Sequence, residues 1–211
     1  MNKTMLLLIA SVVLWSCSST RIIEQWESPD TPVYESNKIL VIGMTADTDL
    51  RRTFEDKLAS GLEKEKIIAV RSIDFFEGSF TDSDKTESDL NTIENQLLEA
   101  GFDAVMISRI TGTEDKVTAV QAVRGFVNDF QNFKDYYRTN QDLYRKNQTQ
   151  SYTIYHTETT VFCICPGKER ELLWRGNIDV VDPYNRERNV NEYVRILLKN
   201  LEEKELVIVP E

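Results

Sequence analysis

The chain has 211 residues, of which 25 are Lys or Arg and 35 are Asp or Glu, so its formal net charge is −10 at pH 7. Such an acidic balance argues against a nucleic-acid groove, which needs clustered Lys and Arg. It also opposes close approach to anionic lipid headgroups. The length is sufficient for one domain, and no second domain is required.

The amino terminus has the pattern of a cleaved signal peptide. Lys3 gives a weakly basic head, and residues 5–14 form the apolar stretch that follows. This stretch suits a signal-peptide core and is too short for the roughly 20 residues that a transmembrane helix needs. We therefore expect residues 1–16 to be removed as a signal peptide.

The apolar stretch ends in the pattern of a bacterial lipoprotein box, Leu14-Trp15-Ser16-Cys17. The cysteine of such a box receives a diacylglyceryl group, and the acyl chains of the mature lipoprotein, palmitate among them, hold it at a membrane. Cys17 is therefore the predicted lipidation site, and a plain secreted protein is the alternative. Ser18 replaces the Asp of an inner-membrane retention signal, which favours the outer membrane. No early acidic cluster follows, which favours the periplasmic face.

The next stretch divides into a predicted tether and the start of a folded domain. Residues 17–37 contain two prolines and several serines with little periodicity, and this composition predicts a lipidated tether. Residues 38–44 are an unbroken apolar run, typical of a central strand covered on both faces. A single α/β periplasmic domain is expected over residues 38–211, with an insertion at 124–150.

A helix is predicted directly after this strand. Asp47 and Asp49 offer N-cap side chains. An apolar residue then recurs at i, i+4, i+8 and i+12, which makes one buried stripe along the helix. The four residues of the stripe are Leu50, Phe54, Leu58 and Leu62. The charged residues between them, Glu55 included, are expected to face away from the core.

The first half of the domain continues as alternating strands and helices. A second strand is expected over residues 67–73, and a second helix begins near Glu87 with Leu90 on its inward face. Gly101 suits the left-handed C-terminal cap of that helix, and residues 103–110 form the third strand. This β-α-β-α-β order predicts parallel pairing with right-handed crossovers.

The second half changes to antiparallel strands and a terminal helix. Strands are expected over residues 117–123, 152–164 and 172–180, with a short edge strand at 206–209. Asn189 is the predicted cap of the last helix, because Glu192 follows three residues later as in a capping box. The predicted fold class is α/β, a mixed β-sheet with helices packed on it.

The insertion at residues 124–150 is rich in Asn, Gln and Asp and carries a row of aromatic residues. The row has the spacing i, i+4, i+7 and i+11, which draws one face of a helix. Its members are Phe126, Phe130, Phe133 and Tyr137. Two interpretations remain open: a helix or flap packed on the domain's own sheet, and a possible partner contact with another envelope protein.

No catalytic, cofactor-binding or metal-binding constellation is recognised in the sequence. His156 is the only histidine, and Glu158 shares its face of a strand. Cys163 and Cys165 have the opposite parity, so a zinc site made from these four is not expected. The two cysteines lie at the upper edge of disulfide separations in an extended strand, and free thiols are expected.

The best location for a hidden site is the loop that carries Asp47 and Asp49. It follows the C-terminal end of a strand, where α/β sheets commonly bind ligands. Only Gly43 precedes the helix, so neither dinucleotide nor phosphate-loop spacing is met. Helix capping is the favoured explanation of the two carboxylates, and a small-ligand or enzymatic site is the alternative.

Several short motifs lie along the chain, at residues 26–29, 38–43, 50–58, 69–72, 101–107 and 172–176. Together they resemble a group of bacterial envelope lipoproteins. In fold this group is similar to the penicillin-binding-protein activator lipoproteins, the curli secretion lipoprotein and the N-terminal domain of TolB. The resemblance implies an α/β domain that works through protein contacts, and it carries over no functional residue.

The sequence therefore predicts a lipid-anchored, non-catalytic accessory or protein-interaction factor of the cell envelope. Its expected partners are a membrane, through the lipid on Cys17, and an envelope protein; no nucleic acid, cofactor or small-molecule ligand is expected. Two alternatives remain: an oligomeric secretion or pore-associated lipoprotein, and a small-ligand-binding or enzymatic domain that uses the Asp47/Asp49 loop.

Overall fold

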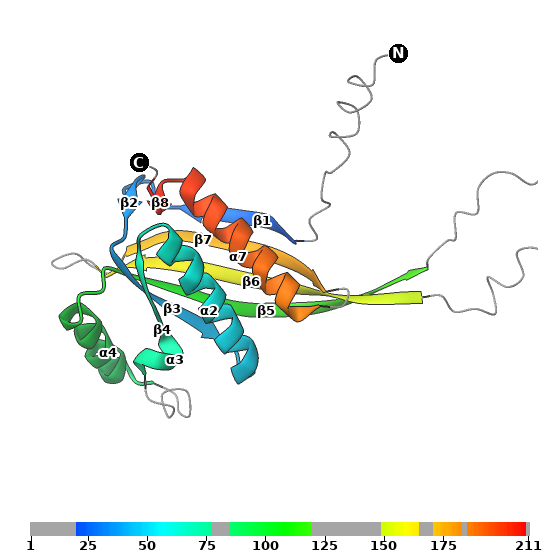
Figure 1. The fold of residues 1–211 in the computed structure, drawn as a ribbon, viewed down its shortest axis with the longest axis horizontal. Coiled ribbons are helices and arrows are strands. Elements are labelled where there is room, and N and C mark those ends of the chain that lie inside the picture. Colours follow the sequence, from blue (N-terminus) through cyan, green and yellow to red (C-terminus); the bar gives the residue numbers. More distant parts are fainter. Residues whose placement is uncertain (1–19, 77–84, 120–148, 165–170, 183–184, 210–211) are drawn as a thin grey trace, which may run out of the picture.

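A computed structural model describes residues 20–76, 85–119, 149–164, 171–182 and 185–209. The main element is a six-stranded mixed sheet with the order β1-β7-β6-β5-β3-β4 (Figure 1). Helices cover both of its faces. The predicted fold class is therefore confirmed.

The parallel half of the sheet follows the predicted order. Strand β3 (Lys38–Met44) lies between β4 (Ile68–Arg71) and β5 (Ala104–Ala119) and is parallel to both. Ile39 and Val41 face one side and Leu40 the other, and all three are fully buried. An apolar run forms an interior strand because both of its faces lose contact with water.

The antiparallel half consists of β6 (Thr149–Cys163), β7 (Glu171–Asp182) and β1 (Thr20–Glu27), as Figure 1 shows. Strand β1 was not predicted from the sequence, and the expectation of an irregular tether across residues 17–37 is wrong for this stretch. Only Thr20 of β1 is buried. A strand is predicted from sequence by alternating apolar and polar residues, and an edge strand with one buried residue lacks that pattern.

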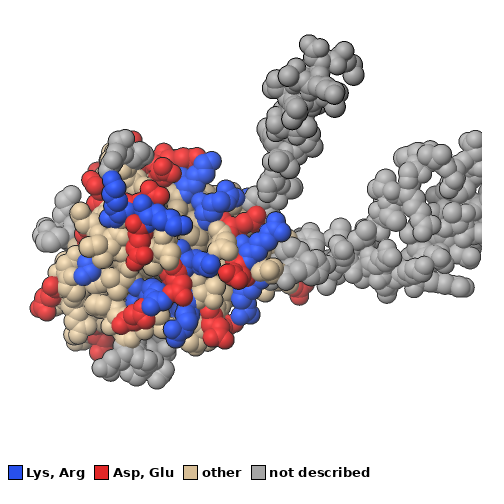
Figure 2. Space-filling model, in the orientation of Figure 1, with Lys and Arg blue, Asp and Glu red and all other residues tan. Residues whose placement is uncertain are grey.

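Helices α2 (Thr48–Lys64) and α7 (Arg186–Glu203) lie side by side on one face of the sheet. Their apolar stripes bury against Trp174, Ile178 and other inward-facing strand residues. The short helix α3 (Ser72–Phe75) and helix α4 (Glu87–Glu99) belong to the second, smaller core on the opposite face. Figure 2 views the face with α2 and α7, where acidic and basic side chains are interspersed.

Two expectations about the helices need correction. Helix α7 begins four residues earlier than predicted, because the side chain of Asn185 accepts the N–H of Arg188 and is the true N-cap. Asn189 is therefore inside the helix and buried. Leu90 of α4 is 49% exposed instead of inward, whereas Gly101 has the expected positive φ of 78° after that helix.

Strand β5 is longer than predicted and combines the expected strands 103–110 and 117–123 up to Ala119. After a bulge between Ile110 and Gly112, its residues 113–119 pair with residues 149–155 of β6. Residues 149–152 of β6 have no partner on the described part of β7, and Figure 1 shows this end of β5 and β6 extending beyond the body of the sheet as a two-stranded ribbon. The insertion predicted at 124–150 lies mostly outside the described residues.

Two further predictions concern the carboxyl-terminal strand, which is partly confirmed, and the state of Cys163, which is corrected. The expected strand at 206–209 is present as β8 (Leu206–Val207), which pairs in parallel with β2 (Tyr34–Glu35) in a separate small sheet. Cys163 is buried and disulfide-bonded, so the expectation of a free thiol there is wrong.

Candidate functional site

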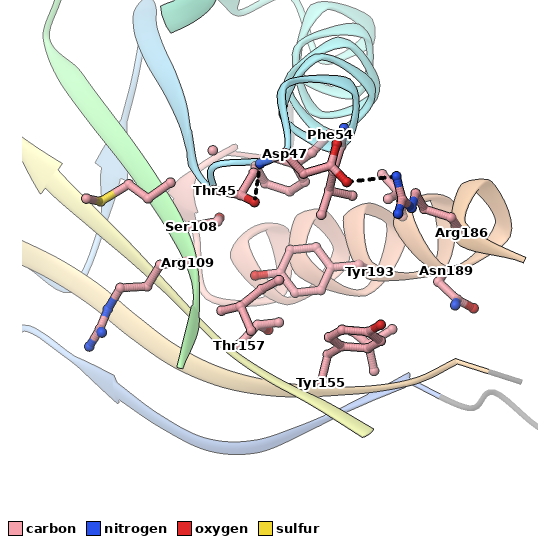
Figure 3. A pocket seen from close by; sticks show the side chains of 16 residues that line it. Thr45, Asp47, Phe54, Ser108, Arg109, Tyr155, Thr157, Arg186, Asn189 and Tyr193 are labelled. Atoms are coloured by element: carbon pink, nitrogen blue, oxygen red, sulfur yellow. Dashed lines mark hydrogen bonds and ion pairs between the residues drawn. The ribbon is translucent and has the colours of Figure 1, made fainter. Parts of the chain in front are cut away.

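A pocket of about 350 Å³ lies between the sheet and the amino-terminal ends of α2 and α7. It opens where β3 ends, which is the location that the sequence analysis selected for a hidden site. Figure 3 shows its side chains converging from α2, α7 and the strands beneath them. Besides the end of β3 and the following loop, its walls come from α2 (Leu50, Phe54), β5 (Ser108 to Ile110), β6 (Tyr155, Thr157), β7 (Val180) and α7 (Arg186, Asn189, Val190, Tyr193).

Asp47 lies at the rim of this pocket and caps α2. Its Oδ1 atom accepts the N–H of Leu50 at 2.9 Å, and its Oδ2 atom lies 2.9 Å from Nη1 of Arg186 on α7 (Figure 3). The Leu50 hydrogen bond is the main cause that lowers the pKa of Asp47, and the charge of Arg186 lowers it further. Helix capping is therefore confirmed for Asp47. Asp49 is exposed in the first turn of α2 and does not line the pocket.

Beneath the pocket, three hydroxyl groups form a buried chain. The hydroxyls of Ser108 and Thr159 are 2.7 Å apart, and Thr159 also contacts the hydroxyl of Tyr193. Burial raises the pKa of Tyr193, so the phenol stays neutral near pH 7. The Tyr193 ring packs edge-on against Phe54 with centroids 5.7 Å apart. This contact joins α7 to α2 at the inner wall.

His156 and Glu158 have different partners. The Nδ1 atom of His156 lies 2.6 Å from Oδ1 of Asp179 on β7, and the histidine side chain is 41% exposed. Glu158 instead pairs with Arg109 and Arg175. Among the residues that the structure describes, no group of three or more His, Cys, Asp or Glu side chains could hold a metal ion.

A second polar cluster lies at the same end of β3 and was missed in the sequence. Glu55 has a fully buried side chain and accepts hydrogen bonds from the N–H of Gly43 at 2.9 Å and of Ile73 at 3.0 Å. Arg51 and Ser72 donate to it as well, at 3.0 and 2.6 Å. The expectation that Glu55 faces away from the core is wrong. We call these five residues the Glu55 cluster.

The remaining candidate residues cannot be placed. Cys17 and the aromatic row Phe126, Phe130, Phe133 and Tyr137 all lie outside the described residues. In the part of the chain that is described, no helix is long and apolar enough to cross a membrane.

The comparisons with known proteins give loose structural likenesses only. No protein-family model and no curated protein sequence matches the chain. Among solved structures, the PelC dodecamer from Paraburkholderia phytofirmans is 9% identical with a TM-score of 0.46, over 89% of this chain and 98% of that chain. Lipoprotein GNA1162 from Neisseria meningitidis is 13% identical with a TM-score of 0.42, over 79% and 98%.

A hypothetical protein from Chlamydia trachomatis is a third likeness, 15% identical with a TM-score of 0.36 over 82% of this chain and 94% of that chain. All three TM-scores are below 0.5, so we take no functional conclusion from them. The resemblance to penicillin-binding-protein activators, the curli secretion lipoprotein and TolB stays a prediction from the sequence.

Proposed function

We propose that the chain is a lipid-anchored lipoprotein of the bacterial envelope whose α/β domain acts without catalysis, by binding another envelope protein. The observation that carries this proposal is the position of the lipoprotein box relative to the fold. Cys17 lies only three residues before Thr20, where strand β1 begins. The anchor site is thus adjacent in the chain to a strand of the main sheet.

This spacing limits how far the domain can stand from a membrane. Three residues of extended chain span at most about 10 Å. Thr20 pairs with Val180 at the end of β7, and its hydroxyl donates to Glu192 of α7 at 3.3 Å. An acyl chain on Cys17 would therefore hold the pocket end of the sheet close to the bilayer surface. The proposed location is the periplasmic face of the outer membrane.

The edge of β1 supports a protein-binding role. Within the described ranges, β1 is the edge strand of the main sheet, and an edge strand can pair with a strand of another chain. Ile23 and Trp26 on β1 are 51% and 46% exposed. Exposed aromatic side chains are frequent anchors of protein interfaces. The aromatic row in 124–150 is the second proposed contact.

The anchor is tested by replacing the lipidated residue. Cys17→Ala is expected to abolish labelling by radioactive palmitate and to release the protein from the envelope fraction, because the acyl chains are the proposed attachment. Ser16→Ala is the matched control, since it keeps a small residue before the cysteine and should retain the label. A Cys17→Ala protein that stays labelled and envelope-bound would disprove the anchor.

The partner contact is tested by photo-crosslinking in intact cells. A crosslinking amino acid at Trp26 should give one defined adduct, and Leu90 on the separate helix α4, which is 49% exposed, is the matched control position. Deletion of 124–150 should reduce the adduct if the aromatic row contributes. A self-adduct would favour the oligomeric alternative. Equal labelling from both positions would count against a specific contact.

A further inference from the structure

The pocket at the end of β3 has a mainly apolar lining. Val180 and Val190 are buried in its walls, and Phe54 packs there beside the Tyr193 ring. Ile110 also lines it and is 40% exposed, although it is a large hydrophobic side chain. Exposed apolar side chains at a pocket are typical of a binding site. The lining therefore fits a hydrocarbon, but it does not by itself identify one.

Several polar side chains of the pocket are bonded to other groups of the protein. Asp47 and Arg186 pair with each other at the mouth (Figure 3). The hydroxyls of Ser108 and Tyr193 both contact that of Thr159. A hydrocarbon chain forms no hydrogen bonds, so it can enter the pocket without competing for these contacts.

The amino-terminal end of strand β1 lies beside the same pocket. Thr20, the first residue of β1, pairs with Val180 of the pocket wall, and the Cα atoms of such antiparallel partners are about 5 Å apart. Figure 1 shows the start of β1 and the first turn of α7 at the same end of the sheet. Cys17 precedes Thr20 by three residues, which span at most about 10 Å. The lipidation site is therefore within about 15 Å of the pocket wall.

An acyl chain on Cys17 can reach the pocket. A membrane acyl chain spans one leaflet, which is half of the roughly 30 Å hydrocarbon core of a bilayer. The pocket volume of about 350 Å³ is at the lower end of the range for ligand pockets, so it has room for one chain. A mature lipoprotein with three acyl chains would keep two in the bilayer, and two chains are sufficient for stable anchoring.

We propose that the pocket holds one acyl chain of the protein's own lipid on Cys17. This inference rests on the proposed anchor and deepens it, because it gives the lipid a binding site on the folded domain. One chain in the pocket and the others in the bilayer hold the amino-terminal ends of α2 and α7 toward the membrane. A phospholipid of the bilayer and a second copy of the chain are the other possible occupants, and the test separates them.

Photo-crosslinking in intact cells grown with radioactive palmitate tests the assignment. A benzophenone amino acid, which reacts with nearby C–H bonds, replaces Ile110 in the full chain. Irradiation should give a monomer in which the tryptic peptide 17–21 is joined through its lipid to the peptide that contains residue 110. Ile68, which is 61% exposed on β4 and does not line the pocket, is the matched control position. Its yield of this adduct should be at least about tenfold lower, because a chain held in the pocket has a high effective concentration there.

A second reporter position keeps the test decisive if the change at Ile110 disturbs the pocket. The benzophenone amino acid at Tyr155, which also lines the pocket (Figure 3), should give the same adduct. Ile110→Asp combined with this reporter should lower the yield at least about threefold, because a carboxylate in the apolar lining would lose hydration against a hydrocarbon. Ile68→Asp should leave the yield unchanged.

Every other result would overturn the assignment. An adduct of residue 110 with a phospholipid would mean that the bilayer supplies the chain, and a crosslinked dimer would mean that a second copy does. A palmitate-labelled protein with equal adducts from positions 110 and 68, or with none, would refute the inference and leave the anchor intact. A protein without the palmitate label would refute both.

Discussion

Two polar side chains are buried near the end of β3, and they lie in different surroundings. Glu55 on α2 is fully buried and receives four donors within the Glu55 cluster. Asn189 on α7 is 8% exposed and lines the pocket. A buried group whose hydrogen bonds are satisfied fixes the positions of the elements that contact it. The Glu55 cluster therefore holds α2 and α3 against the end of β3, whereas Asn189 borders open space.

The largest expected effect is at the structural cluster. Glu55→Ala removes the acceptor from Arg51, Ser72 and two backbone N–H groups. The charge of Arg51, whose side chain is 11% exposed, then has lost its Glu55 partner. We expect a loss of about 3–5 kcal/mol in the free energy of unfolding. Urea denaturation measures it. Glu63→Ala, an exposed position on the same helix, is the control and should change stability by less than about 0.5 kcal/mol. If Glu55→Ala and Glu63→Ala lower the free energy of unfolding equally, the structural role of the Glu55 cluster is wrong.

Gly43 contacts both regions, since its N–H donates to Glu55 and its backbone lines the pocket. A Cβ atom there would lie 3.1 Å from the ring of Phe54, so Gly43→Ala should destabilise the fold by about 1 kcal/mol. Gly112→Ala is the matched control on β5, because its Cβ would meet only His156 at 3.8 Å. Thermal unfolding of both variants checks the difference, and the prediction is wrong if they melt alike.

The smallest effect concerns the pH dependence at the rim. The pKa of Asp47 is lowered in the folded state, so its charged form contributes stability at pH values above the unfolded pKa of about 3.9, and this contribution is lost as the pH falls through the folded pKa. The unaltered chain should therefore be more stable than Asp47→Asn at neutral pH, and the difference should vanish in acid. Asp49→Asn controls for net charge. A stability difference between the unaltered chain and Asp47→Asn that persists in acid would contradict a stabilising role of the ionised Asp47 carboxylate.

The sequence by itself determined the elements whose signal is local. The apolar run of β3, the stripe Leu50 to Leu62 of α2, the cap at Asp47 and the glycine after α4 each follow from neighbouring residues, and each is present as predicted. Parallel pairing in the first half followed from the order of strands and helices. The end of β3 was also selected from the sequence as the place for a hidden site, as a general property of α/β sheets, and a pocket lies there.

Only the tertiary structure decided the rest, because long-range contacts have no local signature. Strand β1 is held by pairing with β7, more than 140 residues away in the chain, and only one of its residues is buried. Glu55 was expected at the surface by its charge, yet donors from β3 and α3 converge on it. Asn189 has a residue type typical of a helix cap, but Asn185 takes that role and leaves the amide of Asn189 at the pocket. Burial and hydrogen bonding of a polar side chain depend on which elements meet there, and that is a property of the folded chain.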